Sequence, residues 1–395
     1  MSISVIVRTV AAPVAVIAAL SAASITSVDA QTTPDSTGTI IGLVTTREGN
    51  VPLSYSVVSA ASLGRERFSD AQGVFALSGL PAGVLQLRVR HLGYSPVDLN
   101  VTVRAGQTDT VRVSLAHIAV RLTAVDVRAY PECKNPGPPK ASADSAFATV
   151  FDQLKQNAEQ YRLLTDTYPF IYATERTLSS TLVNGDSRTE RVDTLVVTST
   201  RWTYKPGSLV VQTRKGFTSS TSMNIPTLVN FAEKTFLENH CFYNGGLETV
   251  NGVELLRVDF NAASKIKDPD VDGSMYLDPV TFQIRRSVLR LSKIPSGLRG
   301  LAETEAVTLF GEVLPSVPVI ADITSVNRFQ SGINKPPTAE ASANERQRLI
   351  GIRFTKGMPG DETKRPDGAS RPGIETAMSL SGDTRGMSRN DMFHP

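Results

Sequence analysis

The sequence predicts a mainly β protein, in which an N-terminal β-sandwich is followed by an α+β domain and a disordered C-terminal tail. Residues 85–90 and 97–103 alternate apolar and polar side chains, which is the pattern of half-buried strands. One apolar stripe at helical spacing begins at Phe147, and further strand patterns follow it. From about Gly332 the chain is polar and rich in Pro, Gly, Ser and Arg. We therefore expect one long helix packed on a curved antiparallel sheet, beside a smaller sandwich.

Residues 1–30 have the pattern of a secretory signal peptide. Arg8 supplies a positive charge, residues 9–25 are apolar, and small residues precede an expected cleavage site before Gln31. The alternative is a retained membrane anchor, but the run is short for a spanning helix and Pro13 interrupts it. We expect an exported protein of the periplasm, outer membrane or cell surface that does not span the membrane after cleavage.

Length and composition limit the classes of partner. Removing 30 residues from 395 leaves about 365, which is room for two domains. The formal net charge is +3 and aromatic residues make up 6% of the chain, with no basic block. Nucleic acid is therefore not expected as a partner.

Residues 38–116 are expected to form the sandwich, after a short linker at 31–37. A third alternating run at 111–115 joins the first two, and glycine-containing turn signals such as Ala105-Gly106 separate the strands. Strict alternation buries one face of a sheet, as is typical of antiparallel strands. Because these strands and turns are all local, we expect the sandwich to fold by itself.

Four motifs in this span resemble a known family. They are Gly-Thr-Ile-Ile-Gly-Leu-Val at 38–44, Asp-Ala-Gln-Gly-Val-Phe at 70–75, Leu-Pro-Ala-Gly at 80–83 and Gly-Tyr at 93–94. Together they resemble the carboxypeptidase regulatory-like domain, which is a prealbumin-like β-sandwich. The resemblance implies a binding or spacer module that carries no catalytic residues of its own.

After a strand and Pro-rich linker at 117–140, residues 141–331 are expected to form the α+β domain. Ser142 or Asp144 can cap the start of its helix. Strand patterns follow the helix, and the tail at 332–395 is expected to add no more than one strand. The helix stripe consists of Phe147, Val150, Phe151, Leu154, Ala158 and Tyr161. The strand patterns lie at 194–204, 208–213, 254–262, 274–277, 283–291, within 306–326, and at 349–354 in the tail.

A hairpin in the second domain supports a further resemblance. The Gly-x-x-x-Leu-Asp-Pro pattern at 273–279 is similar to strands of the half-barrel lipoprotein carriers of the periplasm. The wider segment from 130 to 330 resembles the region downstream of the same module in uncharacterised bacterial envelope proteins. The hairpin resemblance implies a cavity that holds lipid or a lipoprotein.

The chain has two cysteines, Cys133 and Cys241, which an exported protein is expected to join in one disulfide. The alternative is a catalytic thiolate at Cys241, activated by the neighbouring His240. The histidines show no zinc-peptidase spacing, and the sequence contains no nucleophile elbow or phosphate-binding loop. We therefore expect the protein not to be an enzyme.

Asp268, Asp270 and Asp272, followed by Gly273, have the spacing of the first ligands of a calcium loop. The twelfth position is Pro279, where such a loop needs a bidentate Glu. The alternative is a solvated acidic turn that enters a hairpin. We expect no metal ion and no cofactor.

Aromatic residues suggest a ligand surface on the sandwich. Tyr55 and Tyr94, with Phe75, can form a platform on which a sugar stacks. The alternative is that Phe75 belongs to the core and that Tyr94 covers the edge of the sandwich.

The helix offers a second candidate surface, because Phe147, Phe151 and Tyr161 can line an apolar ligand cavity. An ordinary core helix shows the same stripe. The leading function is binding or scaffolding of an envelope protein or glycan. The alternative is a periplasmic carrier of lipid or lipoprotein, which requires an apolar cavity above roughly 300 Å³.

Overall fold

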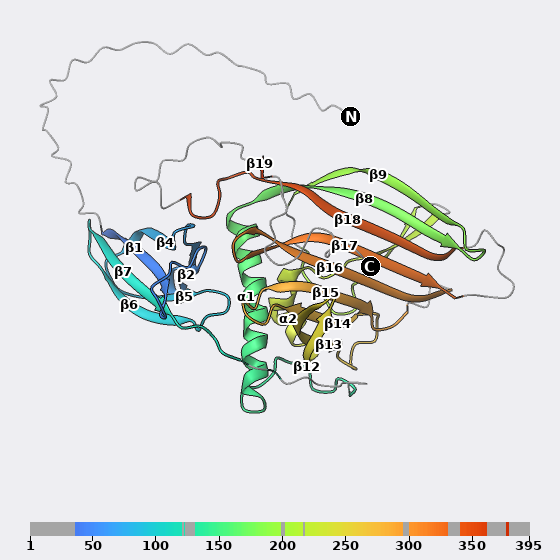
Figure 1. Cartoon of the computed structure of the whole chain (residues 1–395), viewed down its shortest axis with the longest axis horizontal. Helices are drawn as coiled ribbons and strands as arrows, with labels where there is room; N and C mark the ends of the chain where they lie inside the picture. The colour runs from blue at the N-terminus through green and yellow to red at the C-terminus, as the bar shows by residue number, and fades with distance from the viewer. Residues whose placement is uncertain are drawn as a thin grey trace, which may run out of the picture.

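The computed structural model has two folded parts, with one long helix, α1 (Ser145–Thr167), lying between them (Figure 1). A small β-sandwich packs on one side of this helix, and a large curved sheet packs on the other. The structure describes residues 36–120, 122, 131–198, 202–215, 218–294, 300–330, 340–361 and 377–378. The expected signal peptide and nearly all of the linker lie outside these residues.

The sandwich consists of two facing sheets. One has the strand order β4-β1-β7 and the other the order β3-β2-β5-β6. The strands are β1 (Thr37–Thr46), β2 (Val57–Ala60), β3 (Arg65–Phe68), β4 (Val74–Pro81), β5 (Gly83–Arg90), β6 (Val97–Val103) and β7 (Thr108–Leu115), with the 3-10 helix η1 (Ala61–Leu63).

One strand pair in the sandwich differs from the expected antiparallel pattern. β1 and β7 are parallel, with Ile41 opposite Thr110, whereas β1 and β4 are antiparallel. Alternation of apolar and polar residues shows which face of a strand is buried. It does not show whether two neighbouring strands run parallel or antiparallel, because both arrangements bury the same face. The direction of this pair is therefore a property of the whole chain path.

Phe75 is fully buried in the sandwich core, together with Val58 and Leu87. Gly42 on β1 lies against its ring, where an added Cβ would be 2.2 Å from the nearest ring carbon. A glycine is therefore required at this position so that the ring can pack between the sheets.

The predicted helix is present. Asp144 caps it, because its side chain accepts a hydrogen bond from the backbone N–H of Phe147 at 2.9 Å. The stripe residues from Phe147 to Ala158 are buried against the large sheet, and Tyr161 packs beside them. The amphipathic pattern thus correctly located both the helix and its core face.

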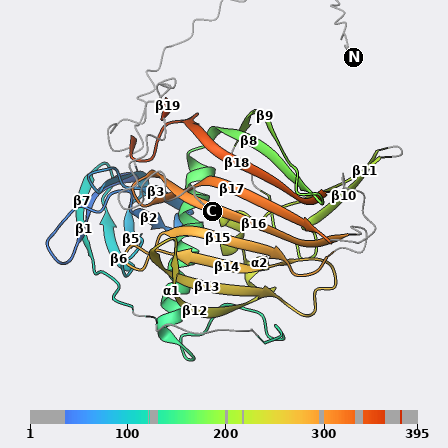
Figure 2. The same cartoon turned by 45° about the vertical axis from the view of Figure 1, so that its right-hand side comes forward.

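The large sheet is antiparallel throughout and curves around α1, with the strand order β12-β13-β14-β15-β16-β17-β18-β8-β9 (Figure 2). A separate hairpin, β10-β11, and two short helices complete the domain. The strands are β8 (Phe170–Leu182), β9 (Ser187–Thr198), β10 (Val210–Lys215), β11 (Thr218–Met223), β12 (His240–Val250), β13 (Val253–Ala262), β14 (Val271–Leu277), β15 (Ile284–Leu291), β16 (Leu301–Leu314), β17 (Val317–Phe329), β18 (Glu340–Phe354) and β19 (Ala377–Met378); the helices are η2 (Leu228–Ala232) and α2 (Lys234–Leu237).

The region expected to be a tail contains a long internal strand. β18 pairs with β17 on one side and with β8 on the other, where Arg348 lies opposite both Asp322 and Glu175. The polar composition of this strand led to the wrong prediction of a disordered tail. The strand is ordered because this part of the sheet carries charged side chains that pair with one another. The remainder of the expected tail, apart from residues 355–361 and β19, lies outside the described residues.

The linker at 117–140 is only partly described. Residues 118–120 are not in a strand, contrary to expectation, and most of the rest of that predicted strand lies outside the described residues. The Pro-rich part runs beside the edge strand β12, where the N–H of Gly137 donates to the carbonyl of His240 at 2.9 Å. It therefore covers part of the edge of the large sheet.

The two parts share one apolar cluster. Tyr55, Val57 and Phe68 of the sandwich are buried with Leu164 of α1 and with Val317 of the large sheet. The segment after β18 also returns to the sandwich, where Gly360 packs against the backbone of Asp70. The sandwich therefore contacts the second domain through this shared apolar cluster, which is separate from the core inside the sandwich.

Candidate functional site

A cavity of about 350 Å³ opens at the junction of the two parts. One wall comes from the β3-β2-β5 face of the sandwich, and the other comes from α1 and the segment around η2. Most of the lining side chains are charged. The lining residues are Ser59, Glu66, Arg88, Arg90, Glu159, Arg162, Val229, Ala232 and Glu233.

Ion pairs across the junction hold two sides of this cavity together. Glu66 of the sandwich accepts hydrogen bonds from Arg90, at 3.0 Å, and from Arg162 of α1, at 2.5 Å. Arg90 also pairs with Glu159 of α1. Burial alone would lower the pKa of Arg162, but the hydrogen bond and charge of Glu66 outweigh it and raise the pKa above its ordinary value. These four charged side chains are therefore paired with one another, and the pairs fix the positions of the cavity walls.

Arg88 and Glu233 are bound differently. The side chain of Arg88 is about half exposed, and its Nε lies 3.6 Å from the carboxylate of Asp98. Glu233 is held by the second domain, where it accepts hydrogen bonds from the N–H of Tyr204, at 3.0 Å, and from the side-chain amide of Asn230, at 3.2 Å. A carboxylate has further lone pairs, so Glu233 can accept another hydrogen bond from the cavity.

His91 forms a second polar contact at the junction, away from the cavity lining. Its Nδ1 lies 3.1 Å from the hydroxyl of Ser56, and its Nε2 lies 3.5 Å from the hydroxyl of Ser316 in the second domain. Burial lowers its pKa to about 4. Gly93 adds a direct hydrogen bond between the two parts, because its N–H donates to the side-chain carbonyl of Gln153 on α1 at 2.8 Å. His91 is therefore a neutral, buried group at the contact between the two parts.

The aromatic residues predicted to stack on a sugar are not brought together on one open face. Phe75 is in the sandwich core, and Tyr55 is buried in the shared cluster between the two parts. Tyr94 is half-buried between His91 and His117, with ring centroids at 5.4 and 5.3 Å. None of the three lines the junction cavity.

The predicted apolar cavity along α1 is occupied by side chains. Phe151 is 2% exposed, and its ring centroid is 4.6 Å from that of Phe242. Phe147 is buried in the same core, and Tyr161 packs at its end. Burial raises the pKa of Tyr161 above its ordinary value. In the described part of the domain, these helix residues therefore form a packed core.

The concave face of the sheet becomes polar beyond this core. Ala306, Ser325, Glu345 and Leu178 are paired across β16, β17, β18 and β8 and so share the face that meets α1. Glu345 accepts two hydrogen bonds from Arg176, at 2.7 and 2.9 Å. An acyl chain placed here would cover charged groups, which is unfavourable.

The three aspartates of the calcium-like pattern point to different partners. Asp272 accepts from the N–H of Ala262 at 2.7 Å, and Asp268 lies against Gly207. Asp270 is fully buried and accepts hydrogen bonds from the Tyr204 hydroxyl and from the N–H of Gly207. Among the described residues, no group of three or more acidic, His or Cys side chains is arranged to hold a metal ion.

His240 is the partner of this buried acid. Its Nδ1 lies 2.9 Å from the carbonyl oxygen of Phe236, and its Nε2 lies 3.1 Å from that of Val271. Both ring nitrogens therefore face oxygens that accept hydrogen bonds, and Nε2 also lies 3.5 Å from the carboxylate of Asp270. Burial alone would raise the pKa of Asp270, but hydrogen bonds from His240, Gly207 and Tyr204 outweigh it and hold that pKa below its ordinary value.

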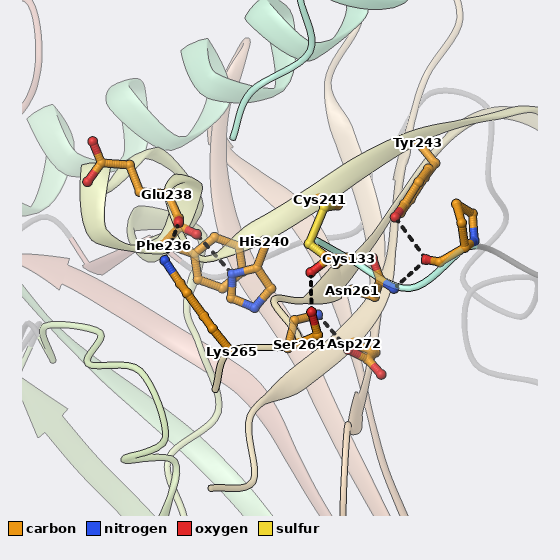
Figure 3. Close-up of a disulfide and its surroundings, with 12 residues drawn as sticks. Cys133, Phe236, Glu238, His240, Cys241, Tyr243, Asn261, Ser264, Lys265 and Asp272 are labelled. Carbon is orange, nitrogen blue, oxygen red and sulfur yellow. Dashed lines mark hydrogen bonds between the residues drawn. A yellow bond between two sulfur atoms is a disulfide. The ribbon is translucent and has the colours of Figure 1, made fainter. Parts of the chain in front are cut away.

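The structure joins Cys133 and Cys241 in a disulfide (Figure 3). The carbonyl of Cys133 also accepts hydrogen bonds from the backbone and hydroxyl of Ser264, both at 2.9 Å. The His240 ring stacks on Phe236, with centroids 3.9 Å apart. The arrangement therefore leaves no free thiol at Cys241, the alternative nucleophile.

The sequence did not point to the junction cavity. Glu66 and Arg162 are 96 residues apart, and Arg90 and Glu159 are 69 residues apart. Each resembles an ordinary solvated charge on a strand or helix. The pattern Arg88-Val-Arg90, with two cations on the wet face of one strand, is the single local signal that the sequence offered.

Within the described residues, none of the helices combines the length and apolar character needed to cross a membrane. Residues 39–116 match the family model of the Carboxypeptidase regulatory-like domain. This agrees with the resemblance expected from the sequence and with the observed sandwich. No curated protein matches the chain.

Solved structures resemble the chain at low similarity. A minor pilin from Streptococcus agalactiae shares 21% identity over 24% of this chain and 49% of its own, with a TM-score of 0.19. A DUF1329 family protein from Desulfovibrio piger shares 12% over 53% and 93%, with a TM-score of 0.30. An outer membrane lipoprotein-sorting protein domain from Vibrio parahaemolyticus shares 11% over 54% and 96%, with a TM-score of 0.29. The chain thus covers about half of the pilin, and we draw no functional argument from similarities at this level. What the comparisons establish is that this chain carries a carboxypeptidase regulatory-like domain at residues 39–116.

Proposed function

We propose that this is an exported, non-catalytic binding protein of the cell envelope, which holds a segment of an envelope protein or glycan in the junction cavity. The cavity carries this proposal. Its volume of about 350 Å³ lies within the range of ligand sites, and its walls are charged and held in place by ion pairs. Walls that are fixed before binding reduce the entropy lost when a ligand binds.

Two features support export to the envelope. The pattern of residues 1–30 is that of a signal peptide, and a disulfide such as Cys133–Cys241 persists in an oxidising compartment. The matched domain type supports a binding or spacer role, rather than a catalytic one, for the sandwich. We propose the periplasm or the cell surface as the location.

The alternative function, transport of lipid or lipoprotein, receives no comparable support. The space between α1 and the sheet is packed around Phe151, and the concave face beyond it carries the Arg176–Glu345 pair. Burying an acyl chain against such groups would remove their hydration without replacing it. The junction cavity is equally unsuited to an acyl chain because of its charged walls.

Site-specific photo-crosslinking in the native host tests the proposal. A photo-reactive amino acid replaces Ala232, which lines the cavity, and in a control it replaces Arg112, which is exposed on β7 in the other sheet of the sandwich. We expect an adduct at position 232 that is absent at position 112. Tryptic peptides of a second protein in the adduct identify a protein partner, and loss of the added mass after muramidase digestion identifies a glycan.

Equal labelling at both positions would contradict a site at the junction. An adduct at position 232 whose added mass, measured by mass spectrometry, is that of a lipid would support the lipid alternative instead.

A further inference from the structure

We propose that the occupant of the junction cavity is a short peptide segment that carries one acidic and one basic side chain. This inference rests on the proposed function and identifies the chemical class of ligand. It follows from which charged groups on each wall remain available to a ligand. It also follows from the lack of aromatic side chains among the described lining residues.

The cationic group that remains for a ligand is on the sandwich wall. Arg90 and Arg162 are occupied by Glu66 and Glu159, whereas Arg88 meets Asp98 through Nε and its two Nη groups form no ion pair with a described residue. A guanidinium pairs with a carboxylate through two parallel hydrogen bonds. Arg88 therefore suits the acidic side chain of a ligand.

The anionic group is on the opposite wall, at the point where η2 ends. Glu233 is fixed by the N–H of Tyr204 and by the amide of Asn230, and both donors belong to the second domain. Val229 and Ala232 line the cavity beside it. A Lys or Arg of the ligand can donate to Glu233 while its methylene groups contact these apolar side chains.

The lining favours a peptide over a glycan. Neutral sugars are commonly held by stacking on an aromatic ring, and the described lining residues include none. A peptide instead offers both charges in a fixed order, together with a backbone N–H that can donate to the Ser59 hydroxyl, whose own proton goes to the carbonyl of Arg88 at 3.3 Å. Because the Arg88 and Glu233 walls belong to different domains, a bound peptide would bridge them.

Calorimetric titration of the full mature protein provides the test. The probes are two dipeptides with acetylated and amidated ends, Glu-Lys and Lys-Glu, compared with Gln-Lys and Glu-Gln as singly charged controls and with chitobiose as a sugar. We expect at least one doubly charged dipeptide to bind about tenfold more tightly than both controls, since a charged hydrogen bond is lost in each. Binding should weaken at high salt.

Variants then locate the site. Arg88→Gln should weaken the doubly charged dipeptide about tenfold and abolish its preference over Gln-Lys, while Arg112→Gln should bind as the wild type does. Glu233→Gln, which can still accept from the N–H of Tyr204, should abolish the preference over Glu-Gln. Melting curves of each variant without ligand confirm that the fold is retained.

Each other outcome overturns the inference. If doubly and singly charged dipeptides bind equally well, the ligand does not need both charges. If Arg88→Gln binds the dipeptides as the wild type does, the site lies elsewhere. Binding of chitobiose without the dipeptides, or of no probe at all, rejects a peptide with these charges. The proposed function would still stand if position 232 crosslinks to a partner, so the two failures are distinguishable.

Discussion

His91 illustrates how one buried side chain makes the domain contact sensitive to acid. Its ring is 6% exposed and lies between the hydroxyls of Ser56 and Ser316, which come from different domains. Desolvation lowers its pKa from 6.5 to about 4. The folded protein therefore keeps this ring neutral at pH values where the unfolded chain is already protonated.

The stability of the protein should fall as the pH is lowered from about 6.5 to about 4. In this window the unfolded state binds a proton that the folded state does not, which costs about 1.4 kcal/mol for each pH unit. Urea unfolding at pH 7 and pH 5 measures the change, and His91→Asn should show a smaller change than the wild type. Arg112→Gln, on the exposed face of β7, provides the control and should retain the wild-type pH dependence. An equal slope in His91→Asn and the wild type would contradict this.

Phe151 tests whether the second domain has a packed core or a cavity. Its ring is buried against Phe242, so Phe151→Ala should lower the free energy of unfolding by about 3–5 kcal/mol. Phe151→Glu should prevent the domain from folding, because the carboxylate would be buried without a partner. Circular dichroism and urea unfolding provide the measurements. A folded Phe151→Glu variant that lacks a lipid found in the wild type by native mass spectrometry would support the carrier instead.

At the scale of elements, the disulfide fastens the segment before α1 to the edge strand β12. It joins residues 108 apart in sequence, and Gly137 adds a hydrogen bond to the same strand. Cross-linking so long a loop restricts the unfolded chain strongly in the chain-entropy model.

The double variant Cys133→Ala/Cys241→Ala should lose about 2–5 kcal/mol of the free energy of unfolding. Thiol labelling of the denatured, unreduced wild type should find no free cysteine, and prior reduction should reveal two. Two reactive thiols in protein taken from an oxidising compartment would refute the bridge. Reduction of the double variant is the control and should leave its stability unchanged.

β18 is the element that joins the β8-β9 hairpin to the rest of the large sheet. A chain that ends at Gly332 should therefore leave that hairpin without its neighbour and expose Phe170, which packs against Phe354. We expect rapid proteolysis at residues 170–198 and a broad melting transition. A chain that ends at Asp361 retains β18 and should melt as the full chain does. Equal protease resistance of the two chains would show that β18 is dispensable.

At the scale of the whole molecule, the sandwich has both a core of its own and a face that needs the second domain. Its internal cluster around Phe75 and Leu87 is local to residues 40–115, which supports independent folding. Val57 and Phe68, however, are buried by α1 and the large sheet. Separation would expose these side chains to water.

Residues 38–116 produced alone should therefore fold but self-associate. Circular dichroism should show a cooperative transition, and analytical ultracentrifugation should show dimers or larger species. Replacing two apolar residues on the exposed face, by Val57→Ser and Phe68→Ser, should restore a monomer without loss of strand content. An isolated sandwich that is monomeric without these changes would show that the shared cluster contributes little to docking.

The sequence by itself determined the local features of this protein. Alternation placed the sandwich strands, helical spacing placed α1 and its core face, and the motifs at 38–94 identified the regulatory-like domain. Each of these signals is read within a short stretch, because periodicity and turn chemistry depend on neighbouring residues. The hairpin that the sequence indicated at 273–279 is also present, because β14 and β15 pair antiparallel and Asp278 accepts a hydrogen bond from the N–H of Thr281 in the turn between them.

Only the tertiary structure decided the parallel direction of β1 and β7, the place of β18 and the docking of the sandwich on α1. It also formed the junction cavity, since Glu66 meets Arg162 only after two separately folded parts come together. The polar strand β18 resembled a solvated tail because its charges are satisfied by partners far away in sequence, such as Arg176 for Glu345. Such pairings depend on the path of the whole chain, which no local pattern of residues records.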